Sequence, residues 1–122
     1  MMFRNDFKNE SINPLKIGIH DLKETIITDK DKIIYCKAES NYTRIYLLNK
    51  SFLVTKALKY VESVLPKNIF IRIHRSYLVN INYISKIKHR STLFIGSNTE
   101  LPIARRKRNI ILKRLNLDNI VI

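Results

Sequence analysis

The sequence predicts a single, mainly β domain with two short helices. Apolar and polar side chains alternate over most of the chain, which is the pattern of strands that bury one face. The alternating segments are rich in Ile, Tyr and Thr, which favour strands. The chain has 122 residues, of which 45% are hydrophobic, so it can bury one core and is too short for two ordinary domains.

The clearest strand is predicted at residues 69–74, where isoleucines alternate with Phe70, Arg72 and His74. The same reasoning predicts strands at 15–20, 25–28, 33–38, 42–48, 51–55, 84–89, 92–95 and 101–103. Because the chain contains only two glycines, its turns must rely on another residue type that tolerates positive φ. Asparagines meet this need, and we expect them to do so at Asn41, Asn49, Asn68 and Asn98, with a tight hairpin at Asn49-Lys50.

Two segments break the alternation and predict helices. In residues 56–65, apolar side chains recur three and four positions apart, Thr55 can cap the first turn, and Pro66 prevents continuation. A second helix is expected at residues 105–115. Its start carries four consecutive cations, Arg105 to Arg108, where the helix dipole favours anions. We interpret these cations as a site for phosphate rather than as helix-stabilising residues.

The charge of the chain indicates a polyanionic partner. Its 23 Lys and Arg and 10 Asp and Glu give a net charge of +13. Residues 1–31 carry five cations and six acids, whereas residues 32–122 carry eighteen cations and four acids, a net charge of +14. No acid lies between Glu62 and Glu100. Such a surface attracts a phosphate backbone, so we expect nucleic acid as the partner.

Several other classes are not expected. No apolar run approaches the length of a membrane span, and residues 1–10 lack the apolar core of a signal peptide, so we predict a cytoplasmic protein without membrane insertion. A lone cysteine, Cys36, cannot form an internal disulfide. His20 and His89 lack metal-ligand spacing, and acids are scarce in the basic segment, so we expect no cofactor, no metal site and no enzymatic activity.

Three motifs resemble those of one family. They read ESNYT at residues 39–43, FIRIHRSYLVN at 70–80 and LPIARR at 101–106. In this order and spacing they resemble the LytTR family of bacterial DNA-binding domains, over roughly residues 15–115. The resemblance implies an elongated arrangement of small antiparallel β-sheets that inserts loops into the major grooves of duplex DNA. It leaves residues 1–14 as an N-terminal arm, expected to be poorly ordered, and residues 116–122 as a C-terminal tail.

The resemblance also implies specific DNA contacts. The family's base-contacting positions correspond to Tyr42, Arg75 and Arg105. Phosphate contacts are expected from residues with donors near the same loops, namely Asn41, Thr43, Lys56, Ser76, Arg106 and Arg108.

The three base-contact positions have structural alternatives. Tyr42 could simply pack on a sheet, and Arg105 could be a solvated residue at a helix end. Strand parity would place Arg75 on the apolar side unless the strand ends or bulges near His74. An unpaired guanidinium is costly to bury, so we favour an exposed Arg75.

The predicted function is that of a sequence-specific transcription regulator on duplex DNA. A second copy of the chain on repeated half-sites, and a sensor kinase or a membrane-bound protein, are the candidate protein partners. The alternative is an RNA-binding or single-strand-binding β domain, which would require a sheet face of exposed aromatic side chains. The sequence leaves open whether the chain is a free-standing regulator or part of a larger one.

Overall fold

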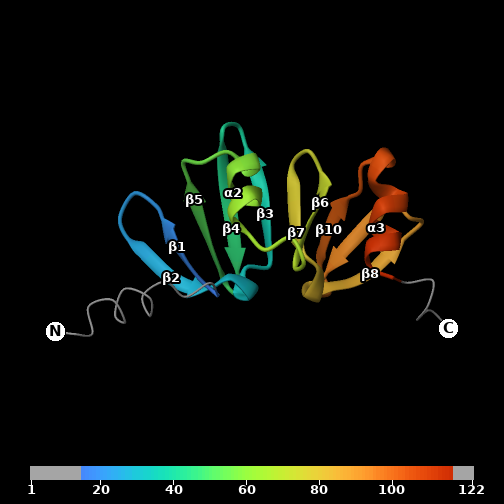
Figure 1. Cartoon of the computed structure of the whole chain (residues 1–122), viewed down its shortest axis with the longest axis horizontal. Helices are drawn as coiled ribbons and strands as arrows, with labels where there is room; N and C mark the ends of the chain where they lie inside the picture. Colours follow the sequence, from blue (N-terminus) through green and yellow to red (C-terminus); the bar gives the residue numbers. More distant parts are fainter. Residues whose placement is uncertain (1–14, 117–122) are drawn as a thin grey trace, which may run out of the picture.

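The computed structural model describes residues 15–116, so the predicted arm at 1–14 and nearly all of the tail at 116–122 lie outside the described residues. Three antiparallel sheets lie side by side in an elongated molecule (Figure 1). The central sheet has the strand order β5-β4-β3-β7-β6 and comprises β3 (Tyr35–Glu39), β4 (Tyr42–Leu47), β5 (Lys50–Val54), β6 (Phe70–His74) and β7 (Tyr77–Asn80). The predicted fold class is therefore confirmed.

Smaller elements flank the central sheet. On one side lie the two-stranded sheet of β1 (Lys16–His20) and β2 (Thr25–Asp29) and the helix α2 (Leu58–Val64). On the other side lie the helix α3 (Arg108–Arg114) and the sheet of β8 (Ile84–Lys88), β9 (Thr92–Ile95) and β10 (Thr99–Pro102). Three short 3₁₀ segments are η1 (Lys30–Lys32), η2 (Ile81–Tyr83) and η3 (Arg105–Lys107) among the described residues.

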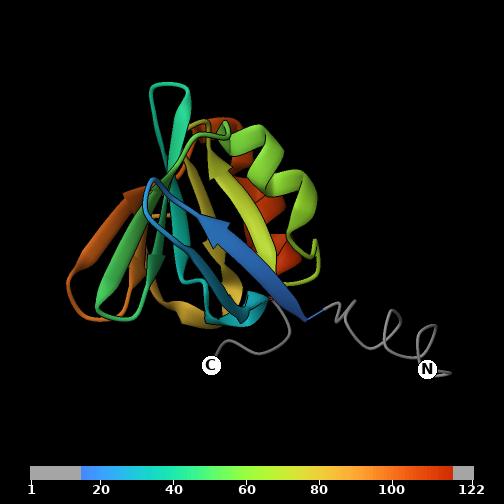
Figure 2. The ribbon, with the colours of Figure 1, turned by 90° about the vertical axis from the view of Figure 1, so that its left-hand side faces the viewer.

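The central sheet buries a hydrophobic core on each face. Cys36, Leu78 and Phe70 belong to the cluster beneath α2 and β1, where Leu58 and Val61 also pack. The opposite cluster lies against β8–β10 and α3, and its buried members include Ile71, Ile73, Val79, Leu93 and Ile111. The view along the long axis shows α2 and the β1–β2 hairpin packed against the sheet (Figure 2). Burial raises the pKa of the Cys36 thiol to about 12.

Most predicted elements are found within one or two residues of their expected bounds, but the helix predicted at 105–115 begins only at Arg108, and strand β7 was not predicted. Its residues Leu78, Val79 and Asn80 are all buried, so the sequence shows no alternation there. The adjoining strand β6 is also buried more fully than predicted, because Phe70 is only 5% exposed.

The turn and cap predictions are partly wrong. Asn49 has a positive φ of 65°, as predicted, but the two-residue turn is Leu48-Asn49, because Leu47 pairs with Lys50. In the turn between β3 and β4, Ser40 and not Asn41 adopts a left-handed conformation, with φ of 59°. Helix α2 begins after Ala57 without a side-chain cap, so Thr55 does not cap it.

Asn80, the last residue of β7, binds the segment that precedes β3 through its side chain. Its side chain is fully buried, and Nδ2 donates to the carbonyls of Asp31, at 3.0 Å, and Ile33, at 2.9 Å. Its Oδ1 accepts from the Asn82 backbone N–H at 2.9 Å. The Asn80 side chain thus joins the end of β7 to residues 47 and 49 positions earlier in the sequence.

We predict that Asn80→Ala destabilises the fold by about 3 kcal/mol, because it leaves buried backbone groups without partners. Urea unfolding measures this loss. Asn82→Ala is the matched control, because the Asn82 side chain is exposed and its substitution should change stability by less than about 0.5 kcal/mol. Equal losses for the two variants would contradict the role assigned to Asn80.

Candidate nucleic-acid interface

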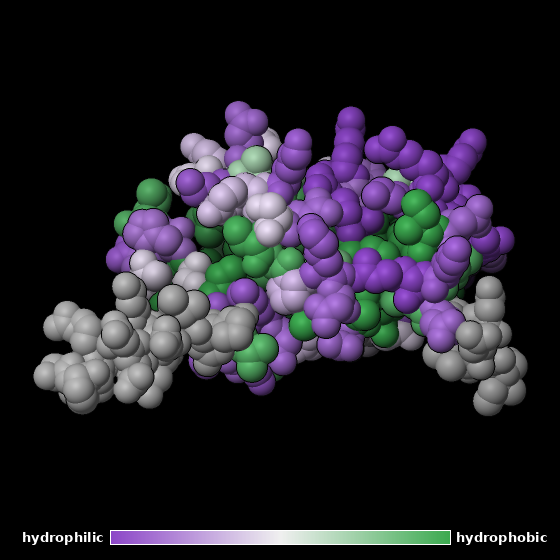
Figure 3. All heavy atoms as spheres, viewed as in Figure 1, coloured by the Kyte–Doolittle hydropathy of each residue, from purple (hydrophilic) through white to green (hydrophobic). Residues whose placement is uncertain are grey.

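Four segments far apart in the sequence meet along one long edge of the molecule, the upper edge in Figure 1. They are the β3–β4 turn, the segment between β5 and α2, the β6–β7 turn and η3. Hydrogen bonds join the neighbouring segments: Ala38 N–H donates to the Ser76 carbonyl at 2.9 Å, and Ala104 N–H donates to the Ile73 carbonyl at 2.8 Å. Hydrophilic side chains project along this edge in the space-filling view (Figure 3).

A β-bulge places Arg75 outside the sheet. Arg72 pairs with Leu78 and His74 pairs with Tyr77, so Ile73 is an extra residue in β6. The strand ends at His74, and Arg75 is exposed in the turn that follows. The structure thus agrees with the exposed Arg75 that we favour on the cost of burying a charge.

Arg72 holds the backbone of this turn in place. Its Nε donates to the His74 carbonyl at 2.9 Å, and its Nη2 donates to the Arg75 carbonyl at 2.6 Å. The remaining nitrogen, Nη1, pairs with Glu62 Oε1 of α2 at 2.7 Å. One guanidinium therefore ties both ends of the Arg75 peptide region to a helix.

His74 supports the same turn from within. Its Nδ1 accepts the Ser76 backbone N–H at 3.0 Å. Its ring lies 5.7 Å from that of Tyr77, measured between centroids. These contacts give His74 a structural role, and Ser76 beside it is partly buried.

The η3 segment lies beside the Arg75 turn. Arg105 and Arg106 are both exposed, whereas Arg108 is partly buried and its Nε has no hydrogen-bond partner among the described residues. The predicted helix at 105–115 is divided, with a 3₁₀ turn before the seven-residue α3. A cleft of about 320 Å³ is lined by side chains from both segments, including Arg75 and Arg106, with Lys59 and Glu62 of α2.

The β3–β4 turn presents a third set of side chains. Asn41 is exposed, and Tyr42 is 46% exposed at the first position of β4. Thr43 is fully buried, and its hydroxyl donates to the Lys56 carbonyl at 2.7 Å. This burial argues against a phosphate contact by Thr43 and gives it the role of positioning Lys56, which is exposed.

The acids near this edge are neutralised by arginines. Arg44 binds Glu39 through Nε–Oε2 and Nη2–Oε1 contacts of 2.8 and 3.3 Å, and this hydrogen bonding lowers the pKa of the Glu39 carboxyl. Glu62 is paired with Arg72. Because neither carboxylate pairs with Arg75, Arg105 or Arg106 in the described chain, the exposed guanidinium groups keep their positive field.

Sequence reasoning missed Arg72 and Glu62 as parts of this interface. Arg72 is visible in the sequence as a cation inside an apolar strand, but its partner on a helix ten residues earlier gives no periodic signal. Within residues 15–116, no three His, Cys, Asp or Glu side chains gather where they could hold a metal ion. None of the helices described has the length and apolar character of a membrane span.

A mainly β domain with basic turns along one edge is typical of proteins that bind nucleic acid, and sequence comparison identifies its family. The family model described as "LytTr DNA-binding domain" matches residues 23–116. The chain therefore belongs to the LytTR family, which confirms the resemblance drawn from the three motifs, and it contains a DNA-binding domain of transcription regulators.

Individual relatives agree with this assignment. The sensory transduction protein LytT of Bacillus subtilis (strain 168) is 28% identical over 114 residues, which cover 90% of this chain and 47% of that protein. The transcriptional regulatory protein YpdB of Escherichia coli O6:H1 is 31% identical over 81 residues, 66% of this chain and 31% of that protein. The chain thus spans less than half the length of either relative.

A solved structure supports the fold assignment. It is the LytTr DNA-binding domain of a methyl-accepting/DNA response regulator from Bacillus cereus. The match has a TM-score of 0.72 and 25% sequence identity, and it covers 82% of this chain and 95% of the other.

We predict that Arg72→Gln loosens the Arg75 turn while the protein stays folded. The variant loses the ion pair to Glu62 and weakens the bonds to two carbonyls, so the Ser76 amide, which is bonded to His74 Nδ1, should exchange with solvent about ten times faster. Hydrogen-exchange NMR measures this. Arg90→Gln is the control, because Arg90 Nη2 donates to Asn109 Oδ1 at 2.7 Å, away from the turn. Unchanged exchange at Ser76 in the Arg72 variant would contradict the assigned role.

Proposed function

We propose that this chain is a sequence-specific regulator of transcription that reads the major grooves of duplex DNA through the turns of its upper edge. The observation that carries the proposal is the arrangement of Tyr42, Arg75 and Arg105. These residues come from three separate motifs, and each is exposed on one of the segments that form this edge: the start of β4, the β6–β7 turn and η3. A duplex extends in one direction, and the elongated edge matches that shape.

Arg75 and Arg105 are the proposed base readers. A guanidinium can donate two parallel hydrogen bonds to O6 and N7 of guanine, a geometry that lysine cannot reproduce. The Arg72 bridge favours such a contact because it fixes the peptide from which Arg75 extends. Tyr42 is the third proposed base contact, since its ring is exposed beside the β3–β4 turn.

The proposed phosphate contacts are Asn41, Lys56, Ser76, Arg106 and Arg108. Asn41, Lys56 and Arg106 are exposed on the segments that form the edge. Ser76 and Arg108 are partly buried, and we include them because their segments adjoin Arg75 and Arg105. Contacts to phosphate fix the register of a protein on DNA without reading its sequence.

The structure favours duplex over single-stranded nucleic acid as the ligand. A single-strand binder stacks bases on a row of exposed aromatic side chains. Here Tyr35 stacks on Tyr46 instead, with centroids 4.2 Å apart, and both rings are partly buried. The most exposed tyrosines described lie on separate elements: Tyr42 on β4, Tyr60 on α2 and Tyr83 on η2.

We further propose that two copies bind repeated half-sites. Three base-reading side chains, each contributing about 1 to 3 kcal/mol of discrimination, scarcely reach the specificity that a genome demands. Two copies on the same face of the duplex would double the number of bases read. The described helices are too short for a coiled-coil dimer, so DNA itself would bring the copies together.

The wider regulatory setting is proposed by analogy with the relatives. One is named a sensory transduction protein and another a transcriptional regulatory protein. We propose that a sensor kinase or a membrane-bound protein controls the chain, and that the chain acts in the cytoplasm, where it meets chromosomal DNA.

We predict that Arg75→Ala and Arg105→Ala each lower the discrimination between target and mismatched duplex by about 1 to 3 kcal/mol. Arg106→Ala is the matched control, since it removes an adjacent exposed guanidinium and should weaken binding to both duplexes alike. Fluorescence anisotropy on the two duplexes at fixed salt measures the difference. If all three variants lose specific and non-specific binding in the same proportion, the proposed division of roles is wrong.

We predict that the free protein is monomeric and that two copies bind together only when their half-sites face the same side of the duplex. Inserting about five base pairs between half-sites rotates one site by half a turn, which should abolish the two-copy complex. Gel shifts measure this effect, and analytical ultracentrifugation measures the state of the free protein. A two-copy complex unaffected by the insertion, or a stable dimer without DNA, would refute this model of assembly.

A further inference from the structure

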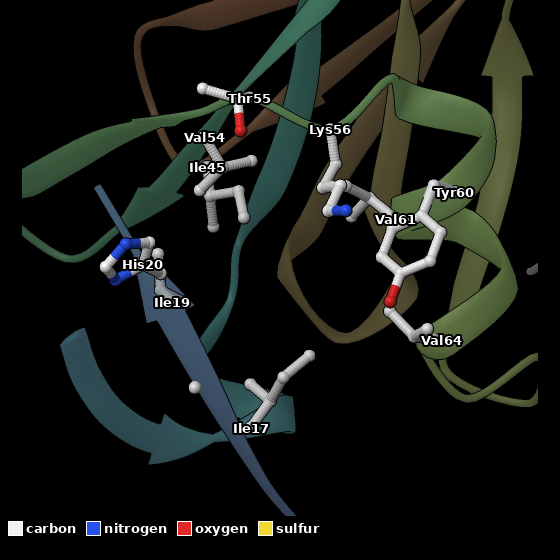
Figure 4. Close-up of a pocket in the computed structure, with 11 residues that line it drawn as sticks. Ile17, Ile19, His20, Ile45, Val54, Thr55, Lys56, Tyr60, Val61 and Val64 are labelled. Carbon is white, nitrogen blue, oxygen red and sulfur yellow. The ribbon is translucent and has the colours of Figure 1, made fainter. Parts of the chain in front are cut away.

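An apolar cavity of about 210 Å³ lies between β1, the β4–β5 hairpin and α2, and the DNA-binding function does not account for it (Figure 4). Its walls are aliphatic side chains from all three parts: Ile17 and Ile19 from β1, Ile45 and Val54 from the central sheet, and Val61 and Val64 from α2. Apolar cavities of about 150 Å³ in proteins can hold a benzene molecule. This space is therefore large enough for a small organic ligand.

One wall of the cavity is held mainly by side-chain packing. Strands β1 and β2 form a separate two-stranded sheet that does not join the central sheet. Ile19 is 2% exposed and packs in the core, with Ile17 partly buried against the same cluster. In the part of the chain described, β1 therefore lies against β5 without strand pairing, and side-chain packing holds this wall in place.

The charge at the cavity is positive. Lys56 lines the cavity, and its amine points toward α2, which forms one wall (Figure 4). Its Nζ is 5.1 Å from the centre of the Tyr60 ring. His20 also lines the cavity, and its Nδ1 is hydrogen-bonded to Thr25 Oγ1 at 2.7 Å. No Asp or Glu of the described chain contributes to the lining. Aliphatic walls with one ammonium group complement a molecule with an aliphatic body and an anionic end.

We propose that this cavity binds a straight-chain aliphatic carboxylate of about eight carbons, with its chain among the isoleucines and valines and its carboxylate on Lys56 Nζ. Lys56 is also one of the proposed phosphate contacts. The bound carboxylate would neutralise this ammonium group, so the ligand should weaken DNA binding. This second consequence rests on the proposed function, whereas ligand binding itself does not.

The direct test uses sodium octanoate below its micelle concentration and follows the methyl resonances of the full chain by NMR. We expect saturable shifts of Ile17, Ile19, Val54 and Val61. From hexanoate to octanoate the dissociation constant should fall about fifteenfold, since two more methylenes are buried and each contributes about fourfold. 1-Octanol, with the same chain and no charge, should bind at least threefold more weakly than octanoate. Shifts that do not saturate, or that spread over the whole surface, would overturn the proposal.

Two variants separate the contributions of the ligand's aliphatic chain and of its charge to the binding affinity. Val64→Trp fills the cavity from a surface position of α2, where Val64 is 37% exposed, and should abolish octanoate binding without affecting DNA binding. In Lys56→Gln, octanoate should bind no more tightly than 1-octanol does. Lys86→Gln is the matched control, because Lys86 Nζ lies 4.4 Å above the Phe94 ring on another sheet, and its loss should change nothing. If Val64→Trp still binds octanoate, the ligand binds outside this cavity and the proposal is wrong.

DNA binding gives an independent readout. Saturating octanoate should weaken DNA binding by about the same factor as Lys56→Gln and should have no further effect on that variant. A protein that binds DNA but not octanoate would overturn this inference and leave the proposed function intact. A protein that binds octanoate but no duplex would overturn the proposed function alone.

Discussion

The pairing of β3 with β7 is the interaction on which the rest of the structure depends. It joins Cys36 to Leu78 and Tyr35 to Val79, and so unites a hairpin from the first half of the chain with one from the second. The same register brings Ala38 to the carbonyl of Ser76, which sets the β3–β4 and β6–β7 turns side by side. The two cores depend on this pairing, because it completes a sheet that is wide enough to be covered on both faces. The basic edge depends on it as well, because the two turns lie on that edge.

The strand-rich fold was largely predictable from alternation and residue type, and the failures have identifiable physical causes. β7 has no alternation because both of its faces are covered, and it follows β6 after only Arg75 and Ser76. The left-handed residue of the β3–β4 turn is a serine, which turn statistics do not favour over the asparagine beside it. Local patterns therefore predict where strands occur better than they predict the turns between them.

In the candidate interface, the exposed cations were predictable from the sequence, but the residues that hold them in place were not. The cations of residues 105–108 and the exposed position of Arg75 are consistent with elementary electrostatic arguments from the sequence. The supporting residues were not predictable, because Arg72 acts through a carboxylate on α2 and through carbonyls whose positions depend on a bulge. Thr43 illustrates the converse: a polar residue beside an exposed turn is buried, since β4 directs alternate side chains inward.

The location of the proposed base readers has a consequence for evolution. Arg75 lies in a turn and Arg105 in a 3₁₀ segment, and neither side chain belongs to the two buried clusters. If they read bases as we propose, exchanging such residues would alter what the edge recognises and leave the packing of the sheet intact, because surface substitutions usually cost little stability. Under the proposed function, duplicated copies of such a gene would diverge toward separate promoters in single mutational steps, without first acquiring compensating changes in the cores.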